Sequence, residues 1–195
     1  MSKVVIIDYG AGNVRSVKFA LERMGITPML SRDAAEIQSA DKIIFPGVGE
    51  ASSSMKALEN YGLIEVIQNA KQPFLGICLG MQMMCESSEE NNTQGLGIFP
   101  LPVKLFAGGT VKVPHMGWNQ IEALKTPIFN GLEEKAYMYF VHSYYVPDSE
   151  WTIAKASYPA PFSAALHKDN FYGCQFHPEK SGTFGQQILK NFIEM

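Results

Sequence analysis

The stretch FLGICLGMQ, residues 74–82, decides the fold and the candidate chemistry of this chain. An apolar run leads to a thiol, Cys78, that stands between Gly76 and Gly80 and precedes residues that favour a helix. Strand, Gly-x-Cys-x-Gly and helix in this order are typical of a nucleophile elbow, in which glycines let the chain reverse around a strained residue. The positive end of a helix that begins at Leu79 favours the thiolate, and the free N–H of Leu79 can stabilise an oxyanion.

A small buried cysteine between packing glycines would give the same local pattern, so a nucleophile also needs a base. His177 is the best placed of the four histidines, because it follows an apolar strand and precedes Pro178, which holds it in an extended conformation. Glu179 is suited to orient the imidazole of this histidine. The sequence therefore predicts a triad of Cys78, His177 and Glu179.

Strand and helix patterns alternate through the first half of the chain. This alternation predicts an α/β fold with a central, mostly parallel, twisted sheet and helices on both faces. Asn13 is expected to cap the first helix. We expect strands at residues 3–9, 28–31, 42–45 and 74–77, and helices at residues 14–24, 33–39 and 50–68, the last one broken near residues 60–62.

The pattern changes after Gly95, where prolines and glycines separate short segments of strand composition. We expect these segments to be antiparallel or mixed strands at one side of the sheet, at residues 104–106, 110–113, 137–146, 152–157 and 162–167. Residues 171–176 should return to the centre of the sheet. A last helix over residues 185–195 should bury Ile188, Leu189, Phe192 and Ile193. We expect one domain over residues 1–195, without a linker or repeat.

The composition of the 195 residues is that of a globular protein, with 46% hydrophobic and 18% charged residues. The net charge of −3 and the lack of a basic block argue against nucleic acid as a partner. The apolar run at the start is too short for a signal peptide or a membrane span. Cys85 and Cys174 are expected in the core, and three cysteines without a CxxC pair indicate neither a disulfide framework nor a metal site. We expect a reduced, cytoplasmic protein without a cofactor.

Two motifs, residues 76–82 and His177-Pro178-Glu179, resemble the class I glutamine amidotransferases, and the resemblance covers essentially the whole chain. In that family a cysteine attacks the side-chain amide of glutamine, ammonia leaves, and a γ-glutamyl thioester is hydrolysed to glutamate. The resemblance implies that Cys78 is the nucleophile, that His177 is first the general base and then the acid, and that Glu179 orients it.

The resemblance also implies a glutamine site. Gln82 would contact the bound glutamine, and the backbone near Ser143 and Tyr144 would hold its α-amino and α-carboxylate groups. His142 would lie near the substrate without belonging to the triad; alternatively, it is a core histidine bonded to the backbone.

The segment Pro46-Gly47-Val48-Gly49 is either a tight turn after a strand or the second side of an oxyanion hole. In the second interpretation the peptide between Gly47 and Val48 rotates its N–H toward the oxyanion, and a partner switches activity by shifting this population. On this hypothesis, replacing Gly47 by proline should abolish turnover and spare the fold.

Four segments resemble one branch of the family, the glutaminase subunits of imidazole glycerol phosphate synthases: residues 8–13, 46–49, 114–119 and 142–144. The branch implies a heterodimer with a (β/α)₈-barrel cyclase that receives ammonia through a channel. Met116 and Trp118 would lie near the docking face, although His115 and Trp118 also fit a packed aromatic corner. Lys180 either faces the partner or is solvated.

Three other functional classes fit parts of the pattern. The first is another enzyme of the same fold, which would be the glutaminase subunit for pyridoxal phosphate or purine synthesis, or a γ-glutamyl hydrolase. The others are a redox or stress-response protein with an elbow cysteine and a regulatory binding subunit. The pair of His177 and Glu179 argues against the last two classes, because neither needs a base with an orienting group.

Overall fold

A seven-stranded sheet forms the centre of the computed structural model, which describes residues 2–109 and 111–195. Five adjacent strands of this sheet are parallel to one another, and two further strands extend the sheet antiparallel at one edge. The predicted α/β class is confirmed. The spatial order is β11 (Thr152–Ser157), β12 (Pro161–Lys168), β13 (Phe171–Cys174), β4 (Phe74–Cys78), β3 (Lys42–Gly47), β1 (Val4–Ile7) and β2 (Met29–Ser31).

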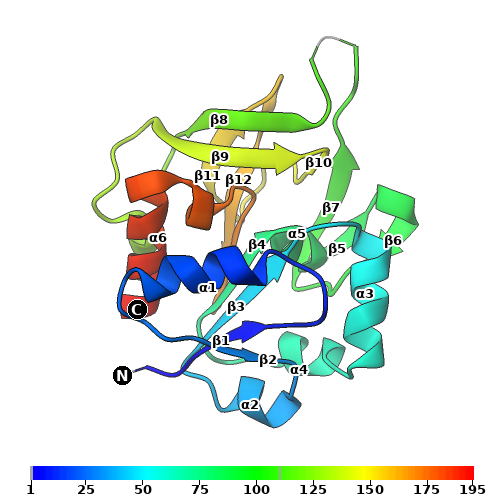
Figure 1. Cartoon of the computed structure of the whole chain (residues 1–195). Helices are drawn as coiled ribbons and strands as arrows, with labels where there is room; N and C mark the ends of the chain where they lie inside the picture. The colour runs from blue at the N-terminus through cyan, green and yellow to red at the C-terminus, as the bar shows by residue number, and fades with distance from the viewer. Residues whose placement is uncertain (1, 110) are drawn as a thin grey trace.

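Helices cover both faces of this sheet, because its central strands are apolar on both sides (Figure 1). Val4 and Ile6 of β1 pack in one core cluster, whereas Val5 and Ile7 pack in the other. The first cluster includes buried residues of α1 (Val14–Glu22) and α6 (Gly182–Glu194). The second includes residues of α2 (Ala34–Gln38), α3 (Ala51–Asn60), α4 (Ile64–Gln68) and α5 (Leu79–Met83).

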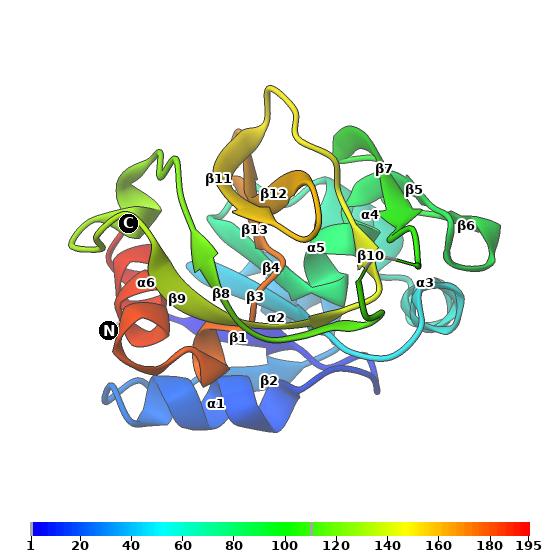
Figure 2. The same cartoon turned by 90° about the horizontal axis from the view of Figure 1, so that it is seen from above.

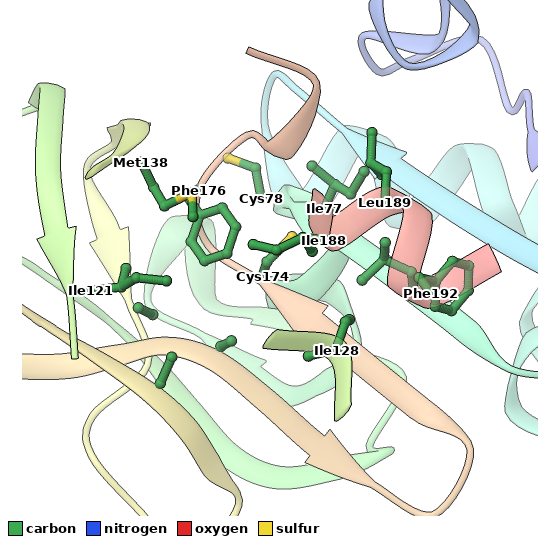
Figure 3. Close-up of a cluster of buried hydrophobic side chains, with 14 of the residues drawn as sticks. Ile77, Cys78, Ile121, Ile128, Met138, Cys174, Phe176, Ile188, Leu189 and Phe192 are labelled. Atoms are coloured by element: carbon green, nitrogen blue, oxygen red, sulfur yellow. The ribbon is translucent and has the colours of Figure 1, made fainter. Parts of the chain in front are cut away.

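The first cluster reaches the elbow. Cys78 at the end of β4 lies in the same cluster as Phe176 and Ile188, and Figure 3 shows these side chains together. The thiol is thus held between the centre of the sheet and the core that α6 covers.

We had expected the strand-rich later segment to lie at one side of the sheet. The structure differs, because this segment is not confined to one side. A hairpin of β8 (His115–Ile121) and β9 (Ala136–His142) lies across the end of the sheet where β4 leads into α5 (Figures 1 and 2). A second small sheet lies beside α5 and contains β10 (Tyr144–Tyr145), β7 (Phe99–Leu105), β5 (Cys85–Ser88) and β6 (Thr93–Gln94). The described part of the chain also contains three short 3-10 helices, η1 (Glu90–Asn92), η2 (Pro127–Phe129) and η3 (Pro178–Lys180).

Several local predictions need correction. The strand expected at residues 110–113 is wrong for residues 111–113, which form a loop, and Thr110 lies outside the described residues. Helix α6 begins at Gly182 rather than at residue 185, and Ile193 is only half-buried. Cys85 and Cys174 are buried as predicted, and Cys85 is the first residue of β5.

Among residues 2–109 and 111–195, no helix combines the length and the apolar character that crossing a membrane requires.

Candidate active site

The elbow has the backbone conformation that the motif predicts. Cys78 has φ 54° and ψ −111°, a strained conformation for a residue with a side chain, and it joins β4 directly to α5. A Cβ atom at Gly80 would overlap the carbonyl oxygen of Phe45, and one at Gly76 would overlap the side chain of Met84. Both flanking glycines are therefore required by close packing beneath the thiol.

The three predicted triad residues come together from β4 and from the turn after β13. His177 Nδ1 lies 2.8 Å from Glu179 Oε1, and both side chains are buried. Burial lowers the pKa of His177, but its interactions with Cys78 and Glu179 outweigh this effect and raise the pKa to about 10. His177 Nε2 has no hydrogen-bond partner among the described residues, so no other residue competes for the proton that this nitrogen exchanges with the thiol.

Asn13 precedes α1 as predicted, but its side chain does not cap the helix. Its Nδ2 instead donates to Glu179 Oε1 at 3.3 Å. The loop after β1 thus supports the acid of the predicted triad, a role that the capping pattern did not indicate.

A cavity of about 320 Å³ opens beside Cys78 and His177. Six more of the predicted site residues line it: Val48, Leu79, Gln82, His142, Ser143 and Tyr144. A larger hollow of about 830 Å³ lies between the end of α1 and α6, but none of the predicted site residues lines it.

Gly47 does not line the cavity. It ends β3 in register with Cys78, and a Cβ atom there would come within 2.8 Å of the Cβ of Leu79. Our expectation that a proline at this position would spare the fold is therefore wrong, because position 47 has no room for a side chain. Val48 and Gly49 differ: Val48 is 39% exposed, and Gly49 has φ +105° with open space around it.

Gln82 is oriented by two hydrogen bonds from its amide nitrogen. Nε2 donates to the carbonyl oxygen of Tyr144 at 2.8 Å and to Gln175 Oε1 at 2.9 Å. His142 Nδ1 donates to the same Tyr144 oxygen at 2.7 Å. Both lone pairs of this carbonyl are therefore used, so it is not free to hold a ligand's ammonium group.

His115 and His142 form a buried pair, with Nδ1 of His115 3.0 Å from Nε2 of His142. Because His142 must donate its Nδ1 proton to a carbonyl, its Nε2 accepts and His115 Nδ1 donates. Burial lowers the pKa of His142 to about 3 and that of His115 to about 4, so both rings are neutral near pH 7. His115 stacks on Phe140 and Tyr158, which confirms the packed aromatic corner for this residue.

Trp118 is not part of this corner. Met116, Trp118 and Tyr137 are 63%, 56% and 51% exposed on the hairpin of β8 and β9, and we call these three residues the hairpin patch. Trp118 packs edge-on against Tyr139, and Lys180 is exposed with its Nζ 5.9 Å from the same tyrosine ring.

Sequence reasoning missed two residues of the site. Glu90 follows β5 and lines the cavity, and one of its oxygens accepts the N–H of Ala51 at 2.8 Å. Burial raises the pKa of its carboxyl group. Gln175 is fully buried behind the thiol. A polar residue inside the apolar run FYGCQF, residues 171–176, was the available signal for Gln175, whereas nothing distinguished Glu90 from its acidic neighbours.

Comparisons with known proteins show the family of this chain. The family model described as "Glutamine amidotransferase class-I" matches residues 5–195. The chain is 55% identical over 195 residues to "Imidazole glycerol phosphate synthase subunit HisH" of Bacteroides fragilis, covering 99% of this chain and 100% of that protein. It is 49% identical to the protein of the same name from Yersinia pseudotuberculosis, covering 98% and 99% of the two chains.

Solved structures show the same fold at low sequence identity. A glutamine amidotransferase matches with a TM-score of 0.77 at 20% identity, covering 98% of this chain and 97% of that one. PurLQS from Thermotoga maritima matches with a TM-score of 0.75 at 18% identity, covering 100% and 99% of the two chains. From the family model and the full-length relatives, this chain belongs to the class I glutamine amidotransferase family.

Proposed function

We propose that this chain hydrolyses glutamine to glutamate and ammonia as the glutaminase subunit of an imidazole glycerol phosphate synthase in histidine biosynthesis. The observation that carries the proposal is the thiol of Cys78, in a strained backbone conformation beside the cavity of about 320 Å³, with the buried pair of His177 and Glu179 next to it. The full-length identity of 55% to a subunit of that synthase supports this assignment over pyridoxal phosphate or purine synthesis.

The reaction begins at Cys78. Its Sγ bonds to the amide carbon of glutamine while His177 Nε2 takes the thiol proton and passes it to the departing nitrogen, so that ammonia leaves and a γ-glutamyl thioester remains. His177 then takes a proton from water, which attacks the thioester, and returns the proton to the sulfur as glutamate forms. Glu179 holds the imidazole through Nδ1, and Asn13 holds Glu179.

Glutamine recognition requires groups for both charged ends of the amino acid. We assign the α-ammonium group to the carboxylate of Glu90 and to Gln82 Oε1, since both residues line the cavity and both hydrogens of the Gln82 amide are already used. The α-carboxylate would then meet backbone N–H groups near Ser143 and Tyr144. A cavity of about 320 Å³ suits one amino acid rather than a nucleotide or a longer peptide.

The oxyanion hole is proposed to combine the N–H of Leu79 with a peptide N–H of the segment from Gly47 to Gly49. Gly47 is packed under the elbow, so the rotation we expect must occur mainly at Val48 and Gly49. A partner that stabilises the rotated peptide would raise the glutaminase rate by population shift.

The partner is proposed to be a (β/α)₈-barrel cyclase that forms a heterodimer with this chain in the cytoplasm. The hairpin patch of Met116, Trp118 and Tyr137 supplies exposed methionine and aromatic surface of the kind found in interface cores, and it lies on the same hairpin that borders the cavity. Passage through a channel would keep ammonia out of water and thus unprotonated.

The assignment of the nucleophile is tested by labelling with a diazo-ketone analogue of glutamine, followed by peptide mass mapping. We expect the label at Cys78 in the wild-type protein and in Cys85→Ser, and no label in Cys78→Ser. Burial raises the pKa of Cys85 and Cys174, so both thiols should stay unlabelled. A label at either of them, or glutamate formation by Cys78→Ser in the presence of the cyclase, would refute the proposal.

The partner and the docking face are tested together by co-purification with the cyclase barrel. We expect glutamate formation to rise when the barrel and its ligand are present. Trp118→Asp should weaken binding strongly, whereas Met29→Asp, a 40% exposed position on the edge strand β2, should not. Equal weakening by both variants would show that the hairpin patch is not part of the interface. Equal glutaminase rates with and without the barrel would contradict the proposed activation by the partner.

A further inference from the structure

Gln175 lies between two residues of the proposed active site. It follows β13, its side chain is fully buried, and its amide contacts Gln82 with one end and Cys78 with the other. The Oε1 end accepts from Gln82 Nε2 at 2.9 Å, and the Nε2 end lies 3.7 Å from Cys78 Sγ. A buried amide has to satisfy both its donor and its acceptor, so this placement constrains the thiol as well as the glutamine.

The direction of these bonds follows from one backbone carbonyl. The Tyr144 oxygen can only accept, so the Gln82 atom that faces it must be the amide nitrogen. The same nitrogen faces Gln175, whose facing atom must therefore be the oxygen. A flipped Gln175 would place two N–H groups against each other, so its own nitrogen is left to face the sulfur. The group that faces the Cys78 thiol is therefore a donor, the side-chain N–H of Gln175.

We propose that Gln175 is a further catalytic residue, whose amide N–H holds the thiolate of Cys78 and directs Sγ toward the substrate amide. The inference rests on the proposed glutaminase activity. A thiolate in a buried site needs a donor to replace the lost water, and hydrogen bonds to a charged acceptor are stronger than neutral ones. The imidazole of His177 is a donor only while it holds the proton, which it gives up to the departing nitrogen, whereas Gln175 supplies a donor throughout the reaction.

Gln175→Glu and Gln175→Met distinguish the effect of the bond to Gln82 from that of the contact with Cys78. Glutamate keeps an acceptor for Gln82 but places an oxygen where the N–H faced Sγ; methionine removes both bonds at similar size. We expect the alkylation rate of Cys78 by iodoacetamide at pH 7 to fall about tenfold or more in both variants, the loss that ~1.4 kcal/mol of thiolate stabilisation implies. The KM for glutamine should rise in Gln175→Met, because Gln82 is released, and should change less than about threefold in Gln175→Glu.

Gln68→Met is the matched control, since the Gln68 amide bonds the carbonyl of Leu96 at 2.8 Å away from the cavity. Peptide mapping restricts the measurement to Cys78, and urea unfolding checks each variant. If Gln175→Glu does not fold, the alkylation rate of Gln175→Met alone tests the inference. An alkylation rate within about twofold of wild type in a folded Gln175→Met would overturn the inference. That outcome leaves the glutaminase proposal intact, because that proposal is tested separately by the labelling of Cys78 and by the activity of Cys78→Ser.

Discussion

The two glycine-containing turns at the active site are held in very different ways. Around Cys78 the flanking Gly76 and Gly80 are packed so closely that neither position has room for a Cβ atom. At the end of β3, Gly47 is packed in the same manner, but Gly49, two residues later, is surrounded by open space. The turn at Cys78 is therefore held by close packing both before and after the cysteine. The turn at Val48 is held by close packing only before the valine, at Gly47.

The difference separates two uses of glycine. At the elbow, absent side chains let the backbones of β3 and α5 approach, and the close packing maintains the strained conformation of Cys78. At Gly49 the absent side chain permits a positive φ without any packing demand. The proposed control by a partner requires this combination, a rigid nucleophile next to a peptide that can rotate.

Gly80→Ala should produce the largest effect, because the new methyl group would overlap the Phe45 carbonyl in the central strand β3. We expect the free energy of unfolding to fall by about 3 kcal/mol or more, as measured by urea denaturation. Gly108→Ala is the matched control, since nothing lies within 4 Å of its Cβ position and its φ is not positive. Equal losses in both variants would contradict the packing argument.

The pH dependence of stability tests the charges that face the elbow. The pKa of His177 is raised to about 10 from a normal value near 6.5, so its stabilisation is complete below about pH 6.5 and is lost as the pH rises through 10. We expect the free energy of unfolding to fall by on the order of 2 kcal/mol across this window.

Cys78→Ser should make this fall smaller, since the thiol is one of the two groups that raise the pKa of His177. Cys85→Ser provides the control, because Cys85 is a core residue that does not contribute to that shift. Urea unfolding at a series of pH values measures both. Stability that increases from pH 7 to pH 10 in the wild-type protein would contradict the assignment.

Gly49→Ala should cost about 1 kcal/mol of stability, from the positive φ alone. The same strain should hinder rotation of the neighbouring peptide, so we expect glutamate formation in the presence of the cyclase to fall about fivefold, the factor that ~1 kcal/mol implies. Gly97→Ala, another open position with positive φ outside the cavity, should lose similar stability and keep its activity. Matching activity losses would show that position 49 has no special role.

Val48→Ala should have the smallest effect. The side chain is 39% exposed, so the free energy of unfolding should change by less than about 0.5 kcal/mol. If the backbone N–H of this residue, and not its side chain, serves the oxyanion, kcat should stay within about twofold of wild type. A strong loss of kcat in a stable variant would assign a role to the side chain.

The sequence predicted the parts of this site that depend on local backbone. Residues 76–80 and 177–179 carry glycine and proline patterns whose conformations follow from short-range sterics, and the structure brings the two segments together at the end of β4 and after β13. The roles of these residues remain proposals. Glu90 and the Asn13 side-chain bond depended on contacts between distant segments, which no local pattern encodes.

The prediction of where the later strands lie was wrong for a similar reason. Strand composition was evident at residues 137–146 and 152–157, but composition does not determine which strands pair. β9 pairs with β8 across the end of the sheet, whereas β11 joins the edge of the main sheet. The packing space at residue 47 also depended on a neighbouring strand and helix, which explains why the expected tolerance of proline there was wrong.

The hydrogen bond between Asn13 and Glu179 joins residues that are 166 positions apart in the chain. The base, the acid and the strand β13 that delivers them all follow the thiol by about a hundred residues. During translation the nucleophile is therefore made long before the groups that activate it. On the proposed mechanism, an unfinished polypeptide therefore has the cysteine without its base and cannot hydrolyse glutamine.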